Sequence, residues 1–258
     1  MVTPLIDGDV LVYETGFGAQ TGWEGSDPPP FEIARELLEN RIANICAIVG
    51  ATSPPIIYLT GKDNFREKIA VTKPYKGNRK QAKPFHYTNL RVYLEHILGA
   101  IVVDGMEADD AMSLAMMRIP NSIICSRDKD LRQVPGWHYS WELANQPSFG
   151  PEFNDGYGWL KLSEDKKKLT GMGDKFFLAQ CIMGDPVDNI TGIPKAGPSK
   201  AFETLDNTKT YEEGLSCVVE LYKGFYGDVW KEMLLENGQL LWMVRELDEE
   251  GKPILWQM

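Results

Sequence analysis

The stretch Glu107-Ala108-Asp109-Asp110 places three carboxylates within four residues, directly after the apolar run Ala100-Ile101-Val102-Val103. The apolar run predicts a buried strand, and the segment from Ala108 through Met117 predicts a helix. Carboxylates this close together repel one another, and burial raises their pKa values further. The stretch therefore indicates either an acidic turn that stays in water or a site for a divalent cation.

Two further acidic groups follow predicted strands. Asp7 ends the apolar run near the start of the chain, and Asp9 comes two residues later. Asp128 and Asp130 come shortly after the apolar run that ends at Cys125. A single aspartate in such a place is more often a turn residue or a helix cap. Three groups in succession favour a functional site over three separate turns.

The strands alternate with helical patterns, which predicts an α/β fold with a parallel sheet. Apolar residues recur at helical spacing over Phe31–Gly50 and Thr88–Leu98, and a further apolar strand is expected at Ile56–Thr60. The Gly- and Pro-rich residues 15–30 predict a loop. Because the carboxyl ends of parallel strands meet at one edge of a sheet, we expect the three acidic groups along that edge.

The composition argues against several classes of protein. The chain has 258 residues, of which 43% are hydrophobic, and no apolar run approaches the ~20 residues of a membrane span. The first residues lack the basic region of a signal peptide, so we expect a cytoplasmic protein. Four scattered cysteines indicate free thiols in a reducing compartment, and three widely separated histidines disfavour a zinc site or a histidine-centred triad.

Positive charge is concentrated in one segment. The whole chain carries a net charge of −10, yet the segment from Lys62 to Lys83 holds eight basic residues and two acids, a balance of +6. Residues 61–84 lack regular periodicity and predict an exposed loop or arch. A charged run is usually a solvated surface, but Tyr75, Phe85 and Tyr87 lie among or beside these cations, an arrangement that suits bases and phosphates together. We therefore expect contact with nucleic acid.

The chain is predicted to be helical from Gly173 to near its end. An apolar helix over Phe176–Met183 leads to the acidic run Gly184-Asp185-Pro186-Val187-Asp188-Asn189, and the turn that follows carries Gly192 and Gly197 ahead of a further helix. This order is typical of a helix–hairpin–helix, whose backbone N–H groups bind anions. A tight turn between two helices would have the same pattern.

Taken in order, these motifs resemble those of the 5′ nuclease superfamily, which includes flap endonucleases, the 5′ nuclease domain of bacterial DNA polymerase I and phage exonucleases. They are most similar to those of podophage 5′→3′ exonucleases. The resemblance extends over roughly Leu5 to Ala201, and its motifs are Asp7-Gly8, Arg66 with Tyr75-Lys76-x-x-Arg79, Glu107 to Asp110, Asp128 to Leu131, and Gly184 to Gly197.

The resemblance implies a fold as well as a reaction. It implies a PIN-like catalytic domain over residues 1–170, with a parallel β-sheet flanked by helices and a basic arch, at about 61–88, over the active site. It also implies a C-terminal helical region over 171–258 that contains a helix–hairpin–helix at about 176–205. The two parts are expected to pack as one compact unit.

The resemblance implies hydrolysis assisted by two Mg²⁺ or Mn²⁺ ions, and the number of carboxylates independently favours the same chemistry. Asp63 takes the place of an aspartate that ends the preceding strand in the family, and a role for Asp9 is left open. The implied metal ligands are Asp7, Asp63, Glu107, Asp109, Asp110, Asp128, Asp130, Asp185 and Asp188.

The family's phosphate-binding residues also have counterparts. Lys76 and Arg79 would stabilise charge on the scissile phosphate, with Tyr75 stacked near a terminal base. The hairpin would bind duplex phosphates, together with a K⁺ ion. The implied DNA-binding residues are Arg66, Lys73, Lys80, Lys83, Gly192, Lys195, Gly197 and Lys200.

The expected function is a structure-specific 5′→3′ DNA exonuclease or flap endonuclease. It would act as a monomer on 5′ ends, duplexes, flaps and RNA primers in RNA–DNA hybrids, in the host cytoplasm if the chain is phage-encoded. The alternatives are a PIN-type single-strand ribonuclease, a non-catalytic module that binds DNA ends or junctions, and a small-molecule phosphatase of another two-metal class. The balance between exonuclease and flap cleavage is left open.

Overall fold

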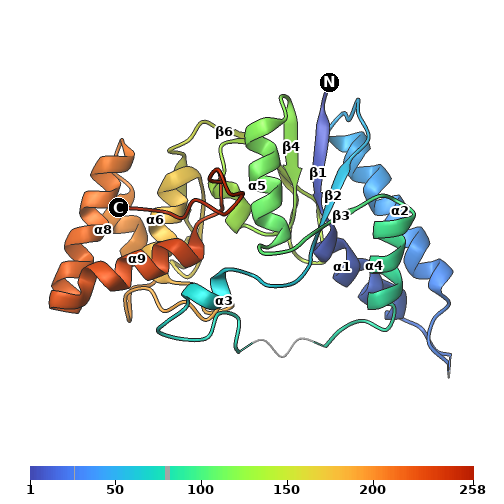
Figure 1. Ribbon diagram of the computed structural model, residues 1–258, viewed down its shortest axis with the longest axis horizontal. Coiled ribbons are helices and arrows are strands. Elements are labelled where there is room, and N and C mark those ends of the chain that lie inside the picture. Colours follow the sequence, from blue (N-terminus) through green and yellow to red (C-terminus); the bar gives the residue numbers. More distant parts are fainter. Residues whose placement is uncertain (26, 79–81) are drawn as a thin grey trace. The chain divides into compact units, whose positions relative to one another are not determined.

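The computed structural model describes residues 1–25, 27–78 and 82–258, which form two compact units (Figure 1). The sheet unit comprises Met1–Asp63, Lys80–Lys129 and Trp137–Phe153. The helical unit comprises Asn64–Arg79, Asp130–Gly136 and Asn154–Met258. These units differ from the expected division at residue 170, because residues 64–79, 130–136 and 154–170 belong to the helical unit. Packing of the whole chain as one compact unit stays a prediction.

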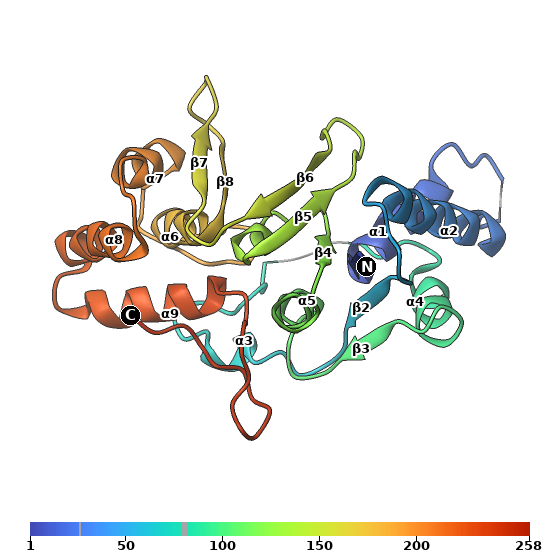
Figure 2. The ribbon, with the colours of Figure 1, turned by 90° about the horizontal axis from the view of Figure 1, so that it is seen from above.

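A six-stranded sheet organises the sheet unit (Figure 2). Its first five strands in spatial order run parallel, and Leu5 of the central strand lies opposite Ile56 on one side and Ile124 on the other. The predicted α/β fold with a mostly parallel sheet is confirmed. In spatial order the strands are β3 (Ile101–Val103), β2 (Ile56–Thr60), β1 (Thr3–Asp7), β4 (Ser122–Cys125), β5 (Gly136–Ser140) and β6 (Phe149–Asn154).

One strand differs from its predicted environment. The run at β3 was expected to be buried, but β3 is an edge strand of the sheet, and Ile101 is 46% exposed. An edge strand has a neighbour on one side only, so an apolar run of three residues there does not require burial on both faces.

Four longer helices complete the sheet unit. They are α1 (Gly8–Gln20), α2 (Phe31–Ile48), α4 (Tyr87–His96) and α5 (Ala108–Arg118). The predicted helices at α2, α4 and α5 are confirmed.

The prediction of a loop from residue 15 is wrong as far as residue 20, because α1 continues to Gln20. Gly16, which favours a loop in the sequence, is needed in this helix, since a Cβ there would lie 2.6 Å from Cγ of Pro84. Here close tertiary packing overrides a weak local preference.

The helical unit is built around α6 (Gly173–Met183), whose side chains are almost all buried. The predicted helices of this region are confirmed. The C-terminal residues 253–256 form no strand, and Pro253 makes only an isolated bridge to Leu247. They pack through Trp256, whose ring fits over Gly238, where a Cβ would lie 2.2 Å from a ring carbon. The remaining elements are α3 (Arg66–Ile69), the 3-10 helix η1 (Asp130–Gln133), the antiparallel pair β7 (Trp159–Leu162) and β8 (Leu169–Met172), α7 (Pro198–Leu205), α8 (Tyr211–Tyr226), the 3-10 helix η2 (Gly227–Val229) and α9 (Trp230–Leu241).

None of the described helices combines the length and the apolar character needed to cross a membrane.

Candidate functional site

Asp7 lies at the end of β1 and is buried, with 3% of its surface exposed. Its Oδ1 accepts the backbone N–H of Val10 at 3.0 Å and so caps α1, and its Oδ2 accepts the hydroxyl of Ser126 at 2.7 Å. Burial raises the pKa of Asp7 from 3.8 to about 7, helped by the charges of Asp9 and Asp128 and opposed by these two hydrogen bonds. Asp7 is thus a buried carboxylate whose negative charge its surroundings leave poorly compensated.

Ser126 links Asp7 to Asp128. The Ser126 hydroxyl, which is buried, donates to Asp7 and accepts the backbone N–H of Asp128 at 2.9 Å. This residue is absent from the predicted site, because a serine at the end of a strand carries no signal that distinguishes it from a turn residue. Its two bonds join the acidic groups that follow β1 and β4.

Asp9 has a protein partner for each of its oxygens. Oδ1 pairs with Nη1 of Arg91 at 2.6 Å, and Oδ2 accepts the backbone N–H of Thr60 at 2.8 Å. Arg91 also donates from Nη2 to the Thr60 carbonyl at 2.6 Å. Asp9 therefore connects α1 to β2 and α4, which gives it a structural role.

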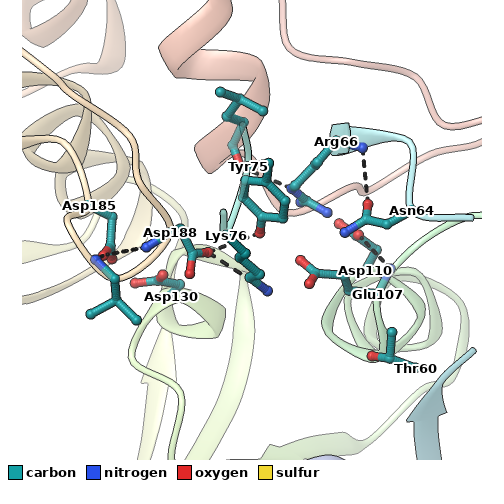
Figure 3. A network of polar contacts seen from close by, with 12 residues as sticks. Thr60, Asn64, Arg66, Tyr75, Lys76, Glu107, Asp110, Asp130, Asp185 and Asp188 are labelled. Carbon is teal, nitrogen blue, oxygen red and sulfur yellow. Dashed lines mark hydrogen bonds and ion pairs between the residues drawn. The ribbon is translucent and has the colours of Figure 1, made fainter. Parts of the chain in front are cut away.

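The acidic stretch from Glu107 to Asp110 forms the beginning of α5 (Figure 3). The side chain of Glu107 accepts the backbone N–H of Asp110, and Oδ2 of Asp110 accepts the N–H of Glu107 at 3.3 Å, which is a reciprocal capping box. The N–H of Ala108 donates to Oγ1 of Thr60 at 2.9 Å. Asp110 is fully buried, and Asp109 is half-buried in the first turn. The positive end of the helix dipole stabilises all three carboxylates, so the acidic stretch serves the fold whether or not it binds a cation.

Asp63 is exposed and has a left-handed backbone, with φ of +63°. The carboxylate that joins the ends of β2 and β3 is instead Asp104, whose Oδ1 accepts the backbone N–H of Lys62 at 2.8 Å. Gly61 leaves room for Asp104, since a Cβ there would lie 2.1 Å from the same oxygen. A metal-binding role for Asp63 stays a prediction.

A second set of predicted ligands lies in the helical unit. Asp185 is buried, and its Oδ1 accepts the backbone N–H groups of Val187 at 2.8 Å and Asp188 at 3.4 Å. Asp130, at the start of η1, accepts Nε2 of Gln180 at 2.6 Å. These bonds fix the orientation of both carboxylates.

Asp188 binds two of the predicted catalytic residues (Figure 3). Its Oδ2 accepts the Tyr75 hydroxyl at 2.9 Å and lies 3.8 Å from Nζ of Lys76. The Tyr75 side chain is 9% exposed and belongs to the core of the helical unit. Because the ring faces protein, Tyr75 is not placed to stack on a terminal base as expected.

The 74–78 loop is fastened to the 185–189 loop by backbone and amide contacts. The N–H of Lys76 donates to the Asp188 carbonyl at 3.0 Å, Asn78 donates to the Pro186 carbonyl at 2.8 Å, and Asn189 donates to the Pro74 carbonyl at 2.9 Å. This part of the basic segment was expected to be an exposed arch, but it is anchored within the helical unit. Its anchors come from residues more than 100 positions later in the chain, which local periodicity does not reveal.

The burial of Arg66 contradicts the prediction that its side chain contacts DNA. It is fully buried, and its guanidinium donates from Nε to the Leu240 carbonyl at 2.9 Å and from Nη2 to the Trp242 carbonyl at 2.7 Å. It therefore stabilises the end of α9 instead of contacting DNA.

Among the other cations predicted to bind DNA, two lysines lie on the surface. Lys73 and Lys83 are exposed, and Nζ of Lys83 lies 4.3 Å from the centre of the Tyr87 ring. Arg79 and Lys80 lie outside the described residues.

The connection between α6 and α7, residues 184–197, folds back on itself through an isolated bridge between Asp185 and Ile190. Gly184 and Gly192 both have left-handed backbones, and a Cβ on Gly192 would lie 2.2 Å from the nitrogen of Gly184. Gly197 precedes the first residue of α7, and Lys195 and Lys200 are exposed on either side of it. A helix N-terminus flanked by exposed cations fits an anion, and its use as a helix–hairpin–helix stays a prediction.

The donor set suits a hard divalent cation, because it consists of carboxylates without histidine or cysteine. Within the described ranges, no three Asp, Glu, His or Cys side chains are grouped closely enough to hold a metal ion by themselves. Mg²⁺ usually keeps several waters and takes one or two carboxylates together with phosphate oxygens. The poorly compensated charge of Asp7 and its link to Asp128 fit that mode of binding.

Two known proteins with similar sequences are a flap endonuclease and a DNA polymerase I. No protein-family model matches the chain. The flap endonuclease Xni of Shewanella halifaxensis (strain HAW-EB4) is 31% identical over 145 residues, which cover 53% of each chain. DNA polymerase I of Bacillus caldotenax is 25% identical over 206 residues, 74% of this chain and 21% of the polymerase. The matched region thus spans about half and about a fifth of these two curated relatives.

Solved structures extend the similarity to nearly the whole chain. The T5 5′-exonuclease with bound divalent (zinc) ions has a TM-score of 0.60 at 15% identity, over 93% of this chain and 89% of that chain. The bacteriophage T5 flap endonuclease in a pseudo-enzyme-product complex with DNA and metal ions has a TM-score of 0.55 at 15% identity, over 93% and 99%. Similarity at this level of identity establishes the fold. The fold expected from the resemblance is confirmed: the chain shares the fold of these two T5 enzymes.

Proposed function

We propose that this chain is a metal-dependent 5′ nuclease that hydrolyses DNA phosphodiester bonds near 5′ ends, at duplex termini and at flaps. One observation carries the proposal: Asp7 is buried at the end of the central strand with its charge poorly compensated, and Ser126 joins it to Asp128. The similarity to a flap endonuclease and the shared fold support the same reading. RNA primers in RNA–DNA hybrids are proposed as further substrates, and the active form is proposed to be a monomer.

The proposed chemistry uses the carboxylates of each unit. Bound Mg²⁺ or Mn²⁺ would supply an activated water and would stabilise the leaving oxygen. In the sheet unit, Asp7 and Asp128 would hold a cation, with the carboxylates at the start of α5 as further direct or water-mediated ligands. In the helical unit, the proposed ligands are Asp130, Asp185 and Asp188.

Cationic side chains would hold the phosphates. Lys76, whose Nζ lies beside Asp188, would stabilise negative charge on the scissile phosphate, with Arg79 as the second cation. Exposed lysines would bind the backbone without reading sequence, so specificity would be for an end or a junction. K⁺ at the turn before α7 is part of the same proposal. The proposed backbone-binding lysines are Lys73, Lys80, Lys83, Lys195 and Lys200.

The test compares Asp128→Ala with the wild-type protein on a 5′-labelled duplex, a flap and a single-stranded RNA, with and without Mg²⁺. We expect the variant to lose cleavage while its DNA affinity stays within about tenfold, because a metal ligand contributes to the reaction more than to phosphate binding. Glu164→Ala, which removes an exposed carboxylate between β7 and β8, is the matched control and should cleave like the wild type.

Three outcomes would contradict the proposal. Cleavage of RNA alone would favour the ribonuclease reading, and binding of DNA without any Mg²⁺-dependent cleavage would favour a DNA-end binding module. A loss of DNA affinity in step with activity in Asp128→Ala would remove the purely metal-binding role of that residue.

A further inference from the structure

Glu236 on α9 holds the beginning of the basic segment. Its Oε1 accepts the backbone N–H groups of Val71 and Thr72, both at 2.7 Å, and its Oε2 accepts the Thr72 hydroxyl at 2.6 Å. One carboxylate thus satisfies three donors from two adjacent residues. All of these atoms belong to the helical unit, in which α3 also packs against α9 (Figure 1).

Contacts on both sides of Lys76 hold the chain around it. Upstream, the clamp made by Glu236 holds residues 71–72. Downstream, the 185–189 loop holds the 74–78 loop through the contacts described above. Only three residues separate Thr72 from Lys76, so the chain between the two anchors has little freedom to move.

The backbone of Lys76 needs such support. Its φ is +54°, a left-handed conformation that costs free energy in a residue other than glycine and persists only where neighbouring contacts enforce it. The bond from the Lys76 N–H to the Asp188 carbonyl, at 3.0 Å, is one such contact. Release of the chain at residues 71–72 would let this turn relax to other conformations.

We propose that Glu236 is a positioning residue for Lys76. Its carboxylate holds residues 71–72 on α9, and this hold keeps the Lys76 ammonium in the orientation in which it meets the scissile phosphate. The inference rests on the proposed nuclease function. It concerns a residue about 160 positions away from Lys76 in sequence that does not itself touch the substrate.

Two substitutions separate the clamp from its charge. Glu236→Ala removes all three acceptor contacts. Glu236→Gln keeps an oxygen for the two backbone N–H groups, and its amide can donate to the Thr72 hydroxyl, so only the charge is lost. Glu232→Ala, one turn earlier on the same helix and exposed, is the matched control.

The first measurement is hydrogen exchange of a peptide spanning residues 66–78, which needs no substrate. We expect faster exchange of the Val71 and Thr72 amides in Glu236→Ala than in the wild type, with Glu236→Gln and Glu232→Ala like the wild type. Melting temperatures of the four proteins show whether the helical unit stays folded. If Glu236→Ala is folded and its Val71 and Thr72 amides exchange as slowly as in the wild type, Glu236 does not hold residues 71–72.

The second measurement is single-turnover cleavage and DNA affinity. We expect Glu236→Ala to cleave about five- to tenfold more slowly, which corresponds to the loss of one or two hydrogen bonds, with DNA affinity within about twofold and with recovery in Glu236→Gln. A wild-type rate in Glu236→Ala despite faster exchange, or a slow Glu236→Gln, would overturn the positioning role. A wild-type protein that cleaves no DNA would refute the proposed nuclease function instead, and the exchange measurement would still decide whether Glu236 holds the segment.

Discussion

Replacement of Asp7 by asparagine should remove a pH-dependent loss of stability from the metal-free protein. Burial raises the pKa of the Asp7 carboxyl from 3.8 to about 7, and the charges of Asp9 and Asp128 add to this effect. In the unfolded chain the group titrates near its ordinary value. Between the two values the folded protein holds a proton that the unfolded chain has released. The free energy of unfolding therefore falls as the pH rises through this range.

The magnitude follows from the difference between the two pKa values. At about 1.4 kcal/mol for each pH unit, the full loss is about 4 kcal/mol, more than half of which falls between pH 5 and pH 8. The side-chain amide introduced by Asp7→Asn would keep an oxygen for the Val10 N–H and place its NH₂ beside the Ser126 hydroxyl, without the charge. The variant should therefore be more stable than the wild type at pH 8 in the absence of metal.

The assay is urea unfolding at pH 5 and pH 8 in the presence of a chelator. The wild type should lose about 3 kcal/mol more than Asp7→Asn between these two pH values. Glu36→Gln, which removes an exposed carboxylate on α2, should follow the wild type. Added Mg²⁺ at pH 8 should stabilise the wild type more than Asp7→Asn, because a ligand stabilises the folded state that binds it. An equal pH dependence in the wild type and Asp7→Asn would refute the assignment of Asp7 as the buried, poorly compensated charge.

Three further predictions follow from single residues. Lys76→Ala should slow single-turnover cleavage by about tenfold or more while DNA affinity changes less, and a wild-type rate would remove Lys76 from the site. Arg66→Met should lower the free energy of unfolding by about 3 kcal/mol, because two carbonyls lose a charged donor, and should leave the salt dependence of DNA binding unchanged. A smaller salt dependence with unchanged stability would restore Arg66 as a DNA contact. Gly192→Ala should lower the free energy of unfolding by about 2 kcal/mol or more, because φ is +59° and the Cβ would lie 2.2 Å from the nitrogen of Gly184. Gly197→Ala should lower it much less, because its Cβ meets no atom within 4 Å. Thermal unfolding of both variants measures the difference.

Local patterns were enough to predict where the first four described strands and most of the described helices lie. Apolar runs and helical periodicity gave the positions of β1, β2, β4, α2, α5 and α6. Helix α1 was not predicted, in part because the two glycines at 16 and 18 resemble a loop unless their packing partners are known. The position of β3 at the sheet edge was also missed, because burial depends on what lies beside a strand and not on the strand itself.

The acidic groups show which part of the candidate site could be predicted from the sequence. Their place after successive parallel strands follows from the alternation of strands and helices, so Asp7 and Asp128 could be expected to lie close together. Sequence did not reveal that Ser126 joins them, or that Arg91 forms an ion pair with Asp9. Both depend on which side chain fills the space beside a carboxylate after the sheet has formed.

The sequence by itself determined the fold class, the superfamily resemblance and the concentration of cations between residues 62 and 83. Only the tertiary structure decided what those residues do. Arg66 bonds a carbonyl 174 positions away, Tyr75 donates to a carboxylate 113 positions away, and Glu236 binds residues 164 and 165 positions before it. Charge and aromatic content are properties of a segment, but burial and hydrogen bonding arise from pairs of residues that the chain brings together only when it folds. Whether a cation in a basic run binds DNA or stabilises the fold therefore depends on the partner that folding brings beside it.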